Sequence, residues 1–443
     1  MNEVGQRIAG EIRDRGAISF ARFMELALYC PNSGYYEKEE DIIGARGDYY
    51  TSVSVGSLFG ELLAFQVAEW LQEGWGAKNE WQRPSPDGKA GQKSQVMRIV
   101  EAGAHGGDLA RDILRWLRQH RPALFQSLEY GIVEPSNRRR DWQQQNLREF
   151  RHKVRWMGKL AELTGGSNPE FCPPHSPGFQ GVMFSNELLD AMPVHRLGWD
   201  ANARIWFEWG VTLQAGQFVW TRILDRGLGN SDQHSINSLS TSLFQLPLEE
   251  RLLDMLPDGF TTEVCPAAEE WWRTAATALG RGKLVALDYG LSADEFFIPE
   301  RKEGTARGYH HHKLSSNVLA NPGEQDITAH VNFTAIRTAG ESAGLTTDSF
   351  LTQAKFLTRI AARTWKDEAS FGEWTPARTR QFQTLTHPEH LGRSFHVLVQ
   401  SRGEQAQGAA GSEKAEREGT EPVVISRCSG VAGAKGKETA IRN

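Results

Sequence analysis

Residues 97–109 read MRIVEAGAHGGDL, and this stretch decides the fold. Its first part, Met97–Val100, is a short apolar-rich strand candidate, and apolar residues return at helical spacing from Leu109 to Leu117. Small residues around Gly103 and Gly107 lie between them. Glycines at such a turn permit positive φ and let a ligand approach the backbone, while the following helix begins with unpaired N–H groups. The stretch therefore predicts a strand, a glycine turn and a helix.

An acidic residue at the end of the next strand candidate indicates the kind of ligand. Glu134 follows Ile132-Val133, and a carboxylate there can accept both hydroxyls of a ribose. It lies 31 positions beyond Gly103, against the ~20 of dinucleotide-binding folds, and the turn itself carries Glu101 and Asp108. Carboxylates repel a pyrophosphate but suit a sulfonium and an ammonium. The pattern favours S-adenosylmethionine over a dinucleotide, and a turn that serves only packing is the alternative.

Composition excludes several classes of protein. A net charge of −5, from 50 Lys and Arg against 55 Asp and Glu, gives no electrostatic case for a nucleic-acid partner. Cys30, Cys172, Cys265 and Cys428 form no CxxC pair, which is typical of reduced thiols and argues against a disulfide framework or zinc site. No apolar run approaches the ~18 residues that span a bilayer, and residues 1–7 resemble neither a signal nor a transit peptide. We therefore expect a cytoplasmic protein with no membrane partner.

Three regions are expected along the chain of 443 residues. Residues 1–95 are predicted to form a helical cap with Ser19 as a cap between two helices, then a lid and a surface linker. Residues 96–402 alternate strands with helices, which predicts a mostly parallel α/β sheet. Residues 403–443 contain no aromatic residue and predict a disordered tail.

The positions of the strand candidates indicate where the chain carries an insertion. An insertion is expected at about 197–282, between the fourth and fifth strands. Within it, residues 206–209 and 218–221 resemble a hairpin, and Glu249 to Leu279 resembles helices broken near Pro257–Pro266. The third to sixth strand candidates are Lys153–Trp156, Gly181–Asn186, Lys283–Asp288 and His396–Ser401.

Polar residues follow the fourth strand candidate. Ligands of open α/β sheets lie outside the carboxyl ends of the strands, so Asn186, Glu187 and Asp190 are expected to face the same crevice as Gly103 and Glu134. If a helix begins after Asn186, Glu187 and Asp190 share one face, and such a carboxylate pair would suit a cationic nucleophile. The alternative is purely structural: Asn186 caps this helix, and Glu187 is an acid favoured by the helix dipole.

Weaker signals occur further along the chain. Asp288 and Tyr289 close the fifth strand candidate, where a turn is the simpler interpretation. Residues 307–312 read RGYHHH, but adjacent histidines point in divergent directions, so we expect no metal site. Contact of His311 or His312 with substrate is the better hypothesis.

The segment 321–333, NPGEQDITAHVNF, is dense in polar groups and predicts a binding or ordering role. Asp326 and Thr328 could also do no more than satisfy backbone groups at that turn. With the segments before it, this block resembles the MidA-like family of class I S-adenosylmethionine-dependent methyltransferases over roughly residues 15–400. The other motifs that carry the resemblance, in the family's order, are ISFARFME (18–25), ALY (27–29), GYY (34–36), GDYYTS (47–52), Asn186-Glu187, DAMPV (190–194) and Asp288-Tyr289-Gly290.

The resemblance implies a class I methyltransferase fold with an N-terminal helical cap, a substrate-side insertion and S-adenosyl-L-methionine as cofactor. Mitochondrial members of the family look like protein arginine methyltransferases that act in the assembly of respiratory complex I. Carried over by position, the cofactor residues would be Glu101, Gly103, Gly107 and Glu134, with Asp48, Tyr50 and Thr51 in a lid, and Asn186 and Glu187 would line the methyl-transfer site.

We therefore interpret the chain as a methyltransferase that acts on a protein arginine nitrogen, with a homodimer left open. A guanidinium has a pKa above ~12, so orientation by carboxylates helps more than a strong base. Glu187, helped by Asp190 or Asp288, is the expected clamp, and His330 or a water is the expected proton acceptor. A nicotinamide-dependent oxidoreductase and a non-catalytic, cofactor-binding assembly factor are the alternatives.

Overall fold

The computed structural model of the protein describes residues 1–38, 51–74, 97–163, 178–223, 250–310, 313–315 and 317–403. Met1–Gly403 forms one compact unit. Several predictions fall outside the described residues: most of the lid, including Asp48 and Tyr50, the linker at 76–95, His311 and His312, and the expected tail beyond Gly403.

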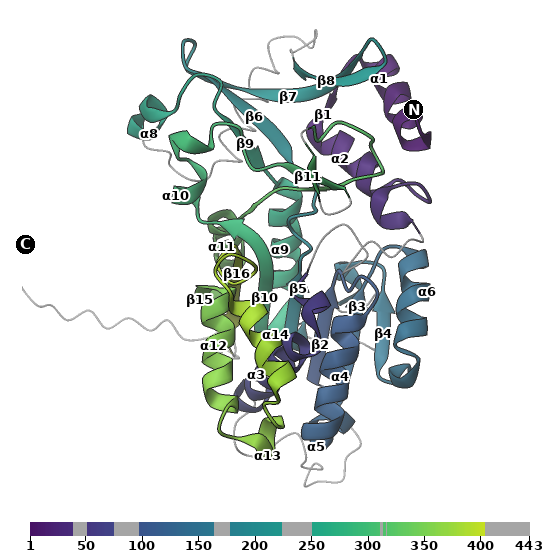
Figure 1. Cartoon of the computed structure of the whole chain (residues 1–443), viewed down its shortest axis with the longest axis vertical. Coiled ribbons are helices and arrows are strands. Elements are labelled where there is room, and N and C mark those ends of the chain that lie inside the picture. Colours follow the sequence, from purple (N-terminus) through teal and green to yellow (C-terminus); the bar gives the residue numbers. More distant parts are fainter. Residues whose placement is uncertain are drawn as a thin grey trace, which may run out of the picture. The chain divides into compact units, whose positions relative to one another are not determined.

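An eight-stranded mixed sheet forms the centre of this unit (Figure 1). Its order is β15-β16-β10-β5-β2-β3-β4, with β14 beside β10. Neighbours from β10 to β4 are parallel, whereas β16 is antiparallel to both β10 and β15. The carboxyl ends of β2, β3 and β5 therefore meet at one edge. The strands are β2 (Met97–Ala102), β3 (Leu128–Val133), β4 (Val154–Met157), β5 (Phe179–Asn186), β10 (Leu279–Leu291), β14 (Val331–Asn332), β15 (Thr346–Thr352) and β16 (Phe395–Arg402).

Helices cover both faces of the sheet because its strands are apolar on both sides, and all six residues of β2 are buried. On one face, α3 (Leu58–Gly74), α4 (Asp108–His120), α12 (Gln353–Thr364) and α14 (Pro376–Thr386) share a core with the strands. On the other, α9 (Pro266–Ala278) and α11 (Phe333–Ser342) do so. The remaining elements here are α5 (Pro122–Ser127), α6 (Asn137–Asn146), α13 (Glu368–Phe371), η2 (Val53–Val55), η4 (Arg148–Phe150) and η5 (Leu160–Leu163).

Two N-terminal helices pack on a second sheet, formed largely by residues between β5 and β10 (Figure 1). The predicted cap at Ser19 is confirmed, since its Oγ accepts from the N–H of Arg22 at 3.1 Å. The order of this sheet is β1-β7-β6-β9, and β8 pairs with β7. Its elements are α1 (Glu3–Arg15), β1 (Ile18–Ser19), α2 (Phe20–Tyr29), η1 (Tyr35–Glu37), β6 (His195–Asp200), β7 (Ile205–Gln214), β8 (Gln217–Arg222) and β9 (Thr261–Val264).

The predicted helices with a break near Pro257–Pro266 are confirmed, but the break contains a strand that was not predicted from the sequence. α8 (Glu250–Met255) and α9 form there, but β9 lies between them. Its sequence Thr-Thr-Glu-Val is rich in β-branched residues, and antiparallel pairing with β6 stabilises it. Beyond β10 come α10 (Ala293–Phe296), η6 (Pro299–Arg301) and a small sheet of β11 (Arg307–His310), β12 (Lys313–Ser315) and β13 (Asp326–Thr328). Among the described residues, we find no helix both long and apolar enough to cross a membrane.

Candidate functional site

The glycine turn after β2 has the geometry that the sequence predicts. Gly103 has φ +75°, and Gly107, the residue before α4, has φ +85°. A Cβ added at Gly103 would lie 2.9 Å from Cδ1 of Leu188, so this position has little room for a side chain. His105 also adopts a left-handed φ of +46°, and its carbonyl accepts from Nε2 of Gln143 at 2.9 Å. Gly103, His105 and Gly107 therefore all adopt left-handed backbone conformations, although His105 carries a side chain.

Glu134 is buried directly beyond β3. Its Oε1 accepts from the N–H of Ser136 at 2.9 Å, and its Oε2 accepts from Nε2 of Gln143 at 3.2 Å. Burial raises the pKa of this carboxyl, and the guanidinium of Arg139 acts in the opposite direction. Each carboxylate oxygen can accept a second hydrogen bond, so the oriented carboxylate can still receive a pair of hydroxyls.

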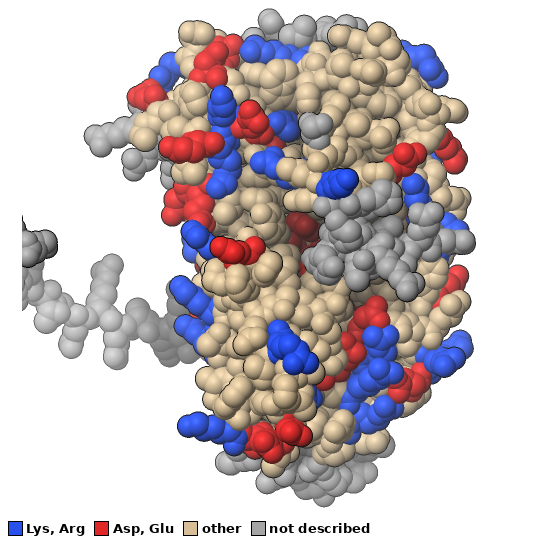
Figure 2. All heavy atoms as spheres, viewed as in Figure 1, with Lys and Arg blue, Asp and Glu red and all other residues tan. Residues whose placement is uncertain are grey.

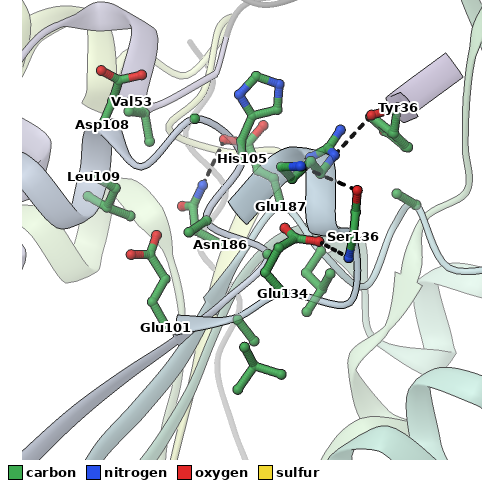
Figure 3. A pocket seen from close by; sticks show the side chains of 18 of the residues that line it. Tyr36, Val53, Glu101, His105, Asp108, Leu109, Glu134, Ser136, Asn186 and Glu187 are labelled. Atoms are coloured by element: carbon green, nitrogen blue, oxygen red, sulfur yellow. Dashed lines mark hydrogen bonds between the residues drawn. The ribbon is translucent and has the colours of Figure 1, made fainter. Parts of the chain in front are cut away.

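Glu101 lies at the end of β2, beneath the glycine turn. Its side chain is 2 % exposed, and the hydroxyl of Tyr130 donates to Oε2 at 2.7 Å. Burial raises the pKa of Glu101 to about 7. Figure 3 shows Glu101, Glu134 and Asn186 at the ends of neighbouring strands, facing the space below His105. Glu101 and Glu134, the acidic residues that the sequence places around the glycine turn, therefore lie at one edge of the sheet.

The chain after β5 does not form the helix considered from the sequence. Glu187 adopts a left-handed φ of +51°, and its N–H donates to the carbonyl of Leu287 at 2.9 Å. The N–H groups of Leu188 and Leu189 donate to Oδ2 of Asp288 at 3.1 and 2.9 Å. The carboxylate of Asp288 thus holds this loop in place of helical hydrogen bonds. Both interpretations that placed a helix start at Asn186 are wrong.

The side chain of Glu187 is held from two sides. Its Oε1 accepts from the backbone N–H of Ser52 and from Nδ2 of Asn186, each at 3.2 Å. Burial raises the pKa of Glu187 to about 8, with a further contribution from the charge of Asp288. Thr51, at the end of the expected lid, lies beside this contact and is 5 % exposed.

Further carboxylates surround Glu187. Burial and the charges of Asp288, Asp326 and Glu187 raise the pKa of Asp190 well above its ordinary value. Burial also raises the pKa of Asp288 to about 6, against its hydrogen bonds from backbone N–H groups. Asp326 accepts from the hydroxyl of Tyr36 at 2.7 Å. We call Glu187, Asp190, Asp288 and Asp326 the acidic cluster.

His330 lies apart from this arrangement, between β13 and β14. Its ring contacts the edge of Tyr289 at a centroid distance of 4.3 Å, and its Nδ1 has no partner among the described residues. Desolvation by burial lowers the pKa of His330 to about 3, so the imidazole is neutral at physiological pH. Among the described residues there is no group of three or more His, Cys, Asp or Glu side chains suited to a metal ion.

A cavity of about 1430 Å³ joins the glycine turn to the loop after β5. Figure 2 shows a hollow near the centre of one face with acidic atoms inside it. Of the predicted site residues, those that line the cavity are Thr51, Glu101, Gly103, Glu134, Asn186 and Glu187. Those that do not are Gly107, Asp190, Asp288 and His330.

Other residues at the cavity had no role in the sequence interpretation. Tyr36 and Arg139 line it, and Gln143 bridges Glu134 to the carbonyl of His105. Tyr36 lies in a motif that carried the family resemblance, and this was the only signal for it. Gln143 gave no signal, because a glutamine inside a polar helix is unremarkable until its buried contacts are known.

Comparison with known proteins identifies the family. Residues 67–351 match the family described as "Putative S-adenosyl-L-methionine-dependent methyltransferase". The chain is 26% identical to protein arginine methyltransferase NDUFAF7, mitochondrial, of Danio rerio, over 89% of this chain and 85% of that protein. It is 25% identical to the NDUFAF7 homolog of Drosophila melanogaster, over 90% of this chain and 85% of that protein. A crystal structure from Burkholderia thailandensis, bound to S-adenosyl-homocysteine, matches with a TM-score of 0.69 and 29% identity, over 91% of this chain and 92% of that chain.

These findings confirm the class I methyltransferase fold and the cofactor, and they favour methyl transfer over the hydride-transfer alternative. The residues present fit S-adenosyl-L-methionine: Gly103 leaves room at the backbone, Glu134 can receive the ribose hydroxyls, and Oδ1 of Asn186 is a buried acceptor without a described partner. One expectation is wrong. The relatives are named as mitochondrial proteins, which contradicts a cytoplasmic location. The chain belongs to this family and is an S-adenosyl-L-methionine-dependent methyltransferase.

Proposed function

We propose that this methyltransferase transfers a methyl group to an arginine nitrogen of a protein substrate, with Glu187 as the residue that holds the guanidinium. The observation that carries this proposal is the acidic cluster, whose member Glu187 lines the cavity. The names of the relatives, which are protein arginine methyltransferases, support the same acceptor.

The charge of the cluster explains why a cation suits it. Carboxylates that share a poorly solvated space raise one another's pKa, as they do for Glu187 and Asp190. A guanidinium at Glu187 removes that repulsion and lets the carboxylate ionise. Both described hydrogen bonds to Glu187 end at Oε1, so Oε2 is free to accept from an incoming N–H. A neutral acceptor would leave the repulsion in place.

The protein's part in the reaction is mainly positioning. The bound cofactor supplies an electrophilic methyl group on a sulfonium. Ser52 and Asn186 fix the carboxylate of Glu187, which orients the guanidinium and needs no strong base. The nitrogen loses a proton once it is methylated, and the carboxylate of Glu187, the member of the acidic cluster that lines the cavity, can take it. His330 does not line the cavity, and its role as the proton acceptor stays a prediction.

We place the protein substrate on the side of the cavity nearest the N-terminal cap and the insertion at 197–282. Residues of the cap region line the cavity, among them Tyr29, Asn32 and Tyr36. The hydroxyl of Tyr29 donates to the carbonyl of Ala191 at 2.9 Å, which ties the cap to the loop after β5. A peptide that enters between them would meet Glu187.

The test is methyl transfer from S-adenosylmethionine, labelled on its methyl group, into a protein extract, followed by peptide mapping. We expect label on arginine side chains, and loss of that label with Glu187→Gln. Label only on other residue types would refute the proposal. Glu300→Gln is the matched control, because Glu300 is exposed and does not line the cavity, and it should label like the wild type.

A further inference from the structure

Ser52 supplies one of the two described hydrogen bonds that hold the carboxylate of Glu187. Its backbone N–H donates to Oε1 at 3.2 Å, and Nδ2 of Asn186 donates to the same oxygen. Asn186 precedes Glu187 directly in the chain, so its amide moves with the loop after β5. Ser52 lies 135 positions from Glu187, in the segment that leads into α3. The direction of the carboxylate therefore depends on what holds Ser52 in place.

The side chain of Ser52 is anchored to a buried glutamine. Its hydroxyl donates to Oε1 of Gln353, the first residue of α12, at 3.0 Å. Nε2 of Gln353 donates in turn to the carbonyl of Leu385, in α14, at 3.1 Å. All three residues are fully buried. A buried amide is costly unless its polar atoms are paired, and here the oxygen and the nitrogen each have a partner, which fixes the orientation of the amide.

The helices that supply this anchor support one another. α12 packs against both α3 and α14 on one face of the central sheet (Figure 1). A second glutamine, Gln381 of α14, accepts from the N–H of Leu58 at 3.1 Å through its Oε1. The segment 51–58 is thus held at both ends, and Gln353 binds the residue of that segment that reaches Glu187.

We propose that Gln353 is a positioning residue for methyl transfer and that it acts through Ser52 on Glu187. Gln353 does not line the cavity, so it affects the reaction without touching a group bound there. Without this anchor, the carboxylate keeps the donor from its own loop but loses the one that fixes it against the rest of the protein. A small misplacement of a positioning group is enough to slow a reaction. This role rests on that of Glu187 in the proposed function.

The pH dependence of the reaction reports on this contact. Glu187 faces Asp288 in β10, Asp190 in its own loop and Asp326 in β13, and burial together with these charges favours its protonated form. The hydrogen bond from Ser52 favours the carboxylate and acts to lower the pKa of Glu187. Loss of that bond should raise this pKa. Ionised Glu187, which the guanidinium needs, should then form only at higher pH.

The assay is the initial rate of arginine labelling from S-adenosylmethionine in a limiting amount of protein extract, per folded molecule, over about pH 6–10. Gln353→Leu should lower the rate at neutral pH about 10-fold and move the midpoint of the profile up by about one pH unit. Ser52→Ala removes the same bond from its other side and should do the same, which keeps the test valid if Gln353→Leu fails to fold. The double variant should be no slower than either single variant, because one contact is lost in all three.

Two further variants separate positioning from stability. Gln353→Glu should restore the wild-type rate and midpoint, because a glutamic acid kept neutral by burial can still accept from Ser52 and donate to Leu385. Gln400→Leu is the matched control. Gln400 is a buried glutamine of β16 that accepts from Nε1 of Trp272 and donates to the carbonyl of Arg337, and it does not line the cavity. This variant should lose stability in urea but keep the midpoint and the rate per folded molecule.

A wild-type midpoint in both Gln353→Leu and Ser52→Ala would overturn the proposal. So would an equal shift in Gln400→Leu, or a Gln353→Glu variant as slow as Gln353→Leu. In the Glu187→Gln background, Gln353→Leu should leave the residual rate unchanged, and a further loss would show that it acts by another route. The two proposals fail differently. An active Glu187→Gln variant refutes the proposed function, whereas an inactive Glu187→Gln beside a normal Gln353→Leu refutes the positioning role alone.

Discussion

Replacing Glu187 by glutamine tests both its burial and its role. In the folded protein its pKa is about 8, against an ordinary value of 4.5. The unfolded chain therefore releases this proton above pH 4.5, whereas the folded protein keeps it until about pH 8. Stability is lost as pH rises through this window, by at most about 1.4 kcal/mol for each pH unit. Because Glu187 is only partly buried by surface area, we expect a total of about 2 kcal/mol.

Glutamine has no proton to release, so Glu187→Gln should remove this dependence. The variant should match the wild type in urea unfolding near pH 5 and exceed its stability by about 2 kcal/mol near pH 8.5. Its Oε1 can still accept from Ser52. Methyl transfer per folded molecule should nevertheless fall by about 10²-fold or more, because a carboxamide cannot hold a guanidinium as a carboxylate does.

Two results would refute this reasoning. If the variant and the wild type lost the same stability between pH 5 and pH 8.5, the carboxyl of Glu187 would not be poorly solvated. Full activity of the variant would show that Glu187 does not position the acceptor. Glu300→Gln serves again as the control, and it should alter neither property.

Four further changes give separate tests. Gly103→Val puts a branched side chain at a φ of +75° and should abolish calorimetric binding of S-adenosylhomocysteine while the protein stays folded; binding within tenfold of the wild type would contradict the turn's role. Glu134→Ala should weaken the same binding by about 1–3 kcal/mol, and unchanged affinity would remove Glu134 from the ribose site. Tyr36→Phe removes one hydroxyl donor from the buried Asp326 and should reduce stability in urea by about 1–2 kcal/mol; equal stability would make that bond dispensable. A chain that ends at Arg402 should keep the melting temperature and cofactor affinity, and a drop in either would show that the tail contributes.

The glycine turn was predictable because its signals are local. Residues 97–117 contain an apolar strand, small residues and a helical repeat, and β2 and α4 form there as expected. The loop after β5 was not predictable in this way. The acceptor for the N–H groups of Leu188 and Leu189 is Asp288, about 100 positions away, so a local pattern that favours a helix start is overridden.

The walls of the cavity show the same limit. The sequence places Glu101, Glu134 and Glu187 at the carboxyl ends of predicted parallel strands. Because these ends meet at one edge of a sheet, the three residues could be expected to lie close together. The bond from Tyr36 to Asp326 joins residues 290 positions apart, and nothing near either one indicates the other. Strand β9 was missed for a related reason, since its pairing with β6 is formed across a long separation.

The docking of the N-terminal helices has a consequence for how the protein is made. Val4 and Ile8 share a core with Val211 and Ile327, and Nδ2 of Asn2 donates to the carbonyl of Pro322 at 2.8 Å. At a synthesis rate of about 5–20 residues per second, Val211 leaves the ribosome roughly 10–40 s after the helices, and Pro322 and Ile327 leave it roughly 15–60 s after them. Until then the apolar face of the helices lacks part of its native cover. The nascent protein is therefore a candidate client for a holding chaperone, and the helices made first cannot reach their native place until the last of their partners has emerged.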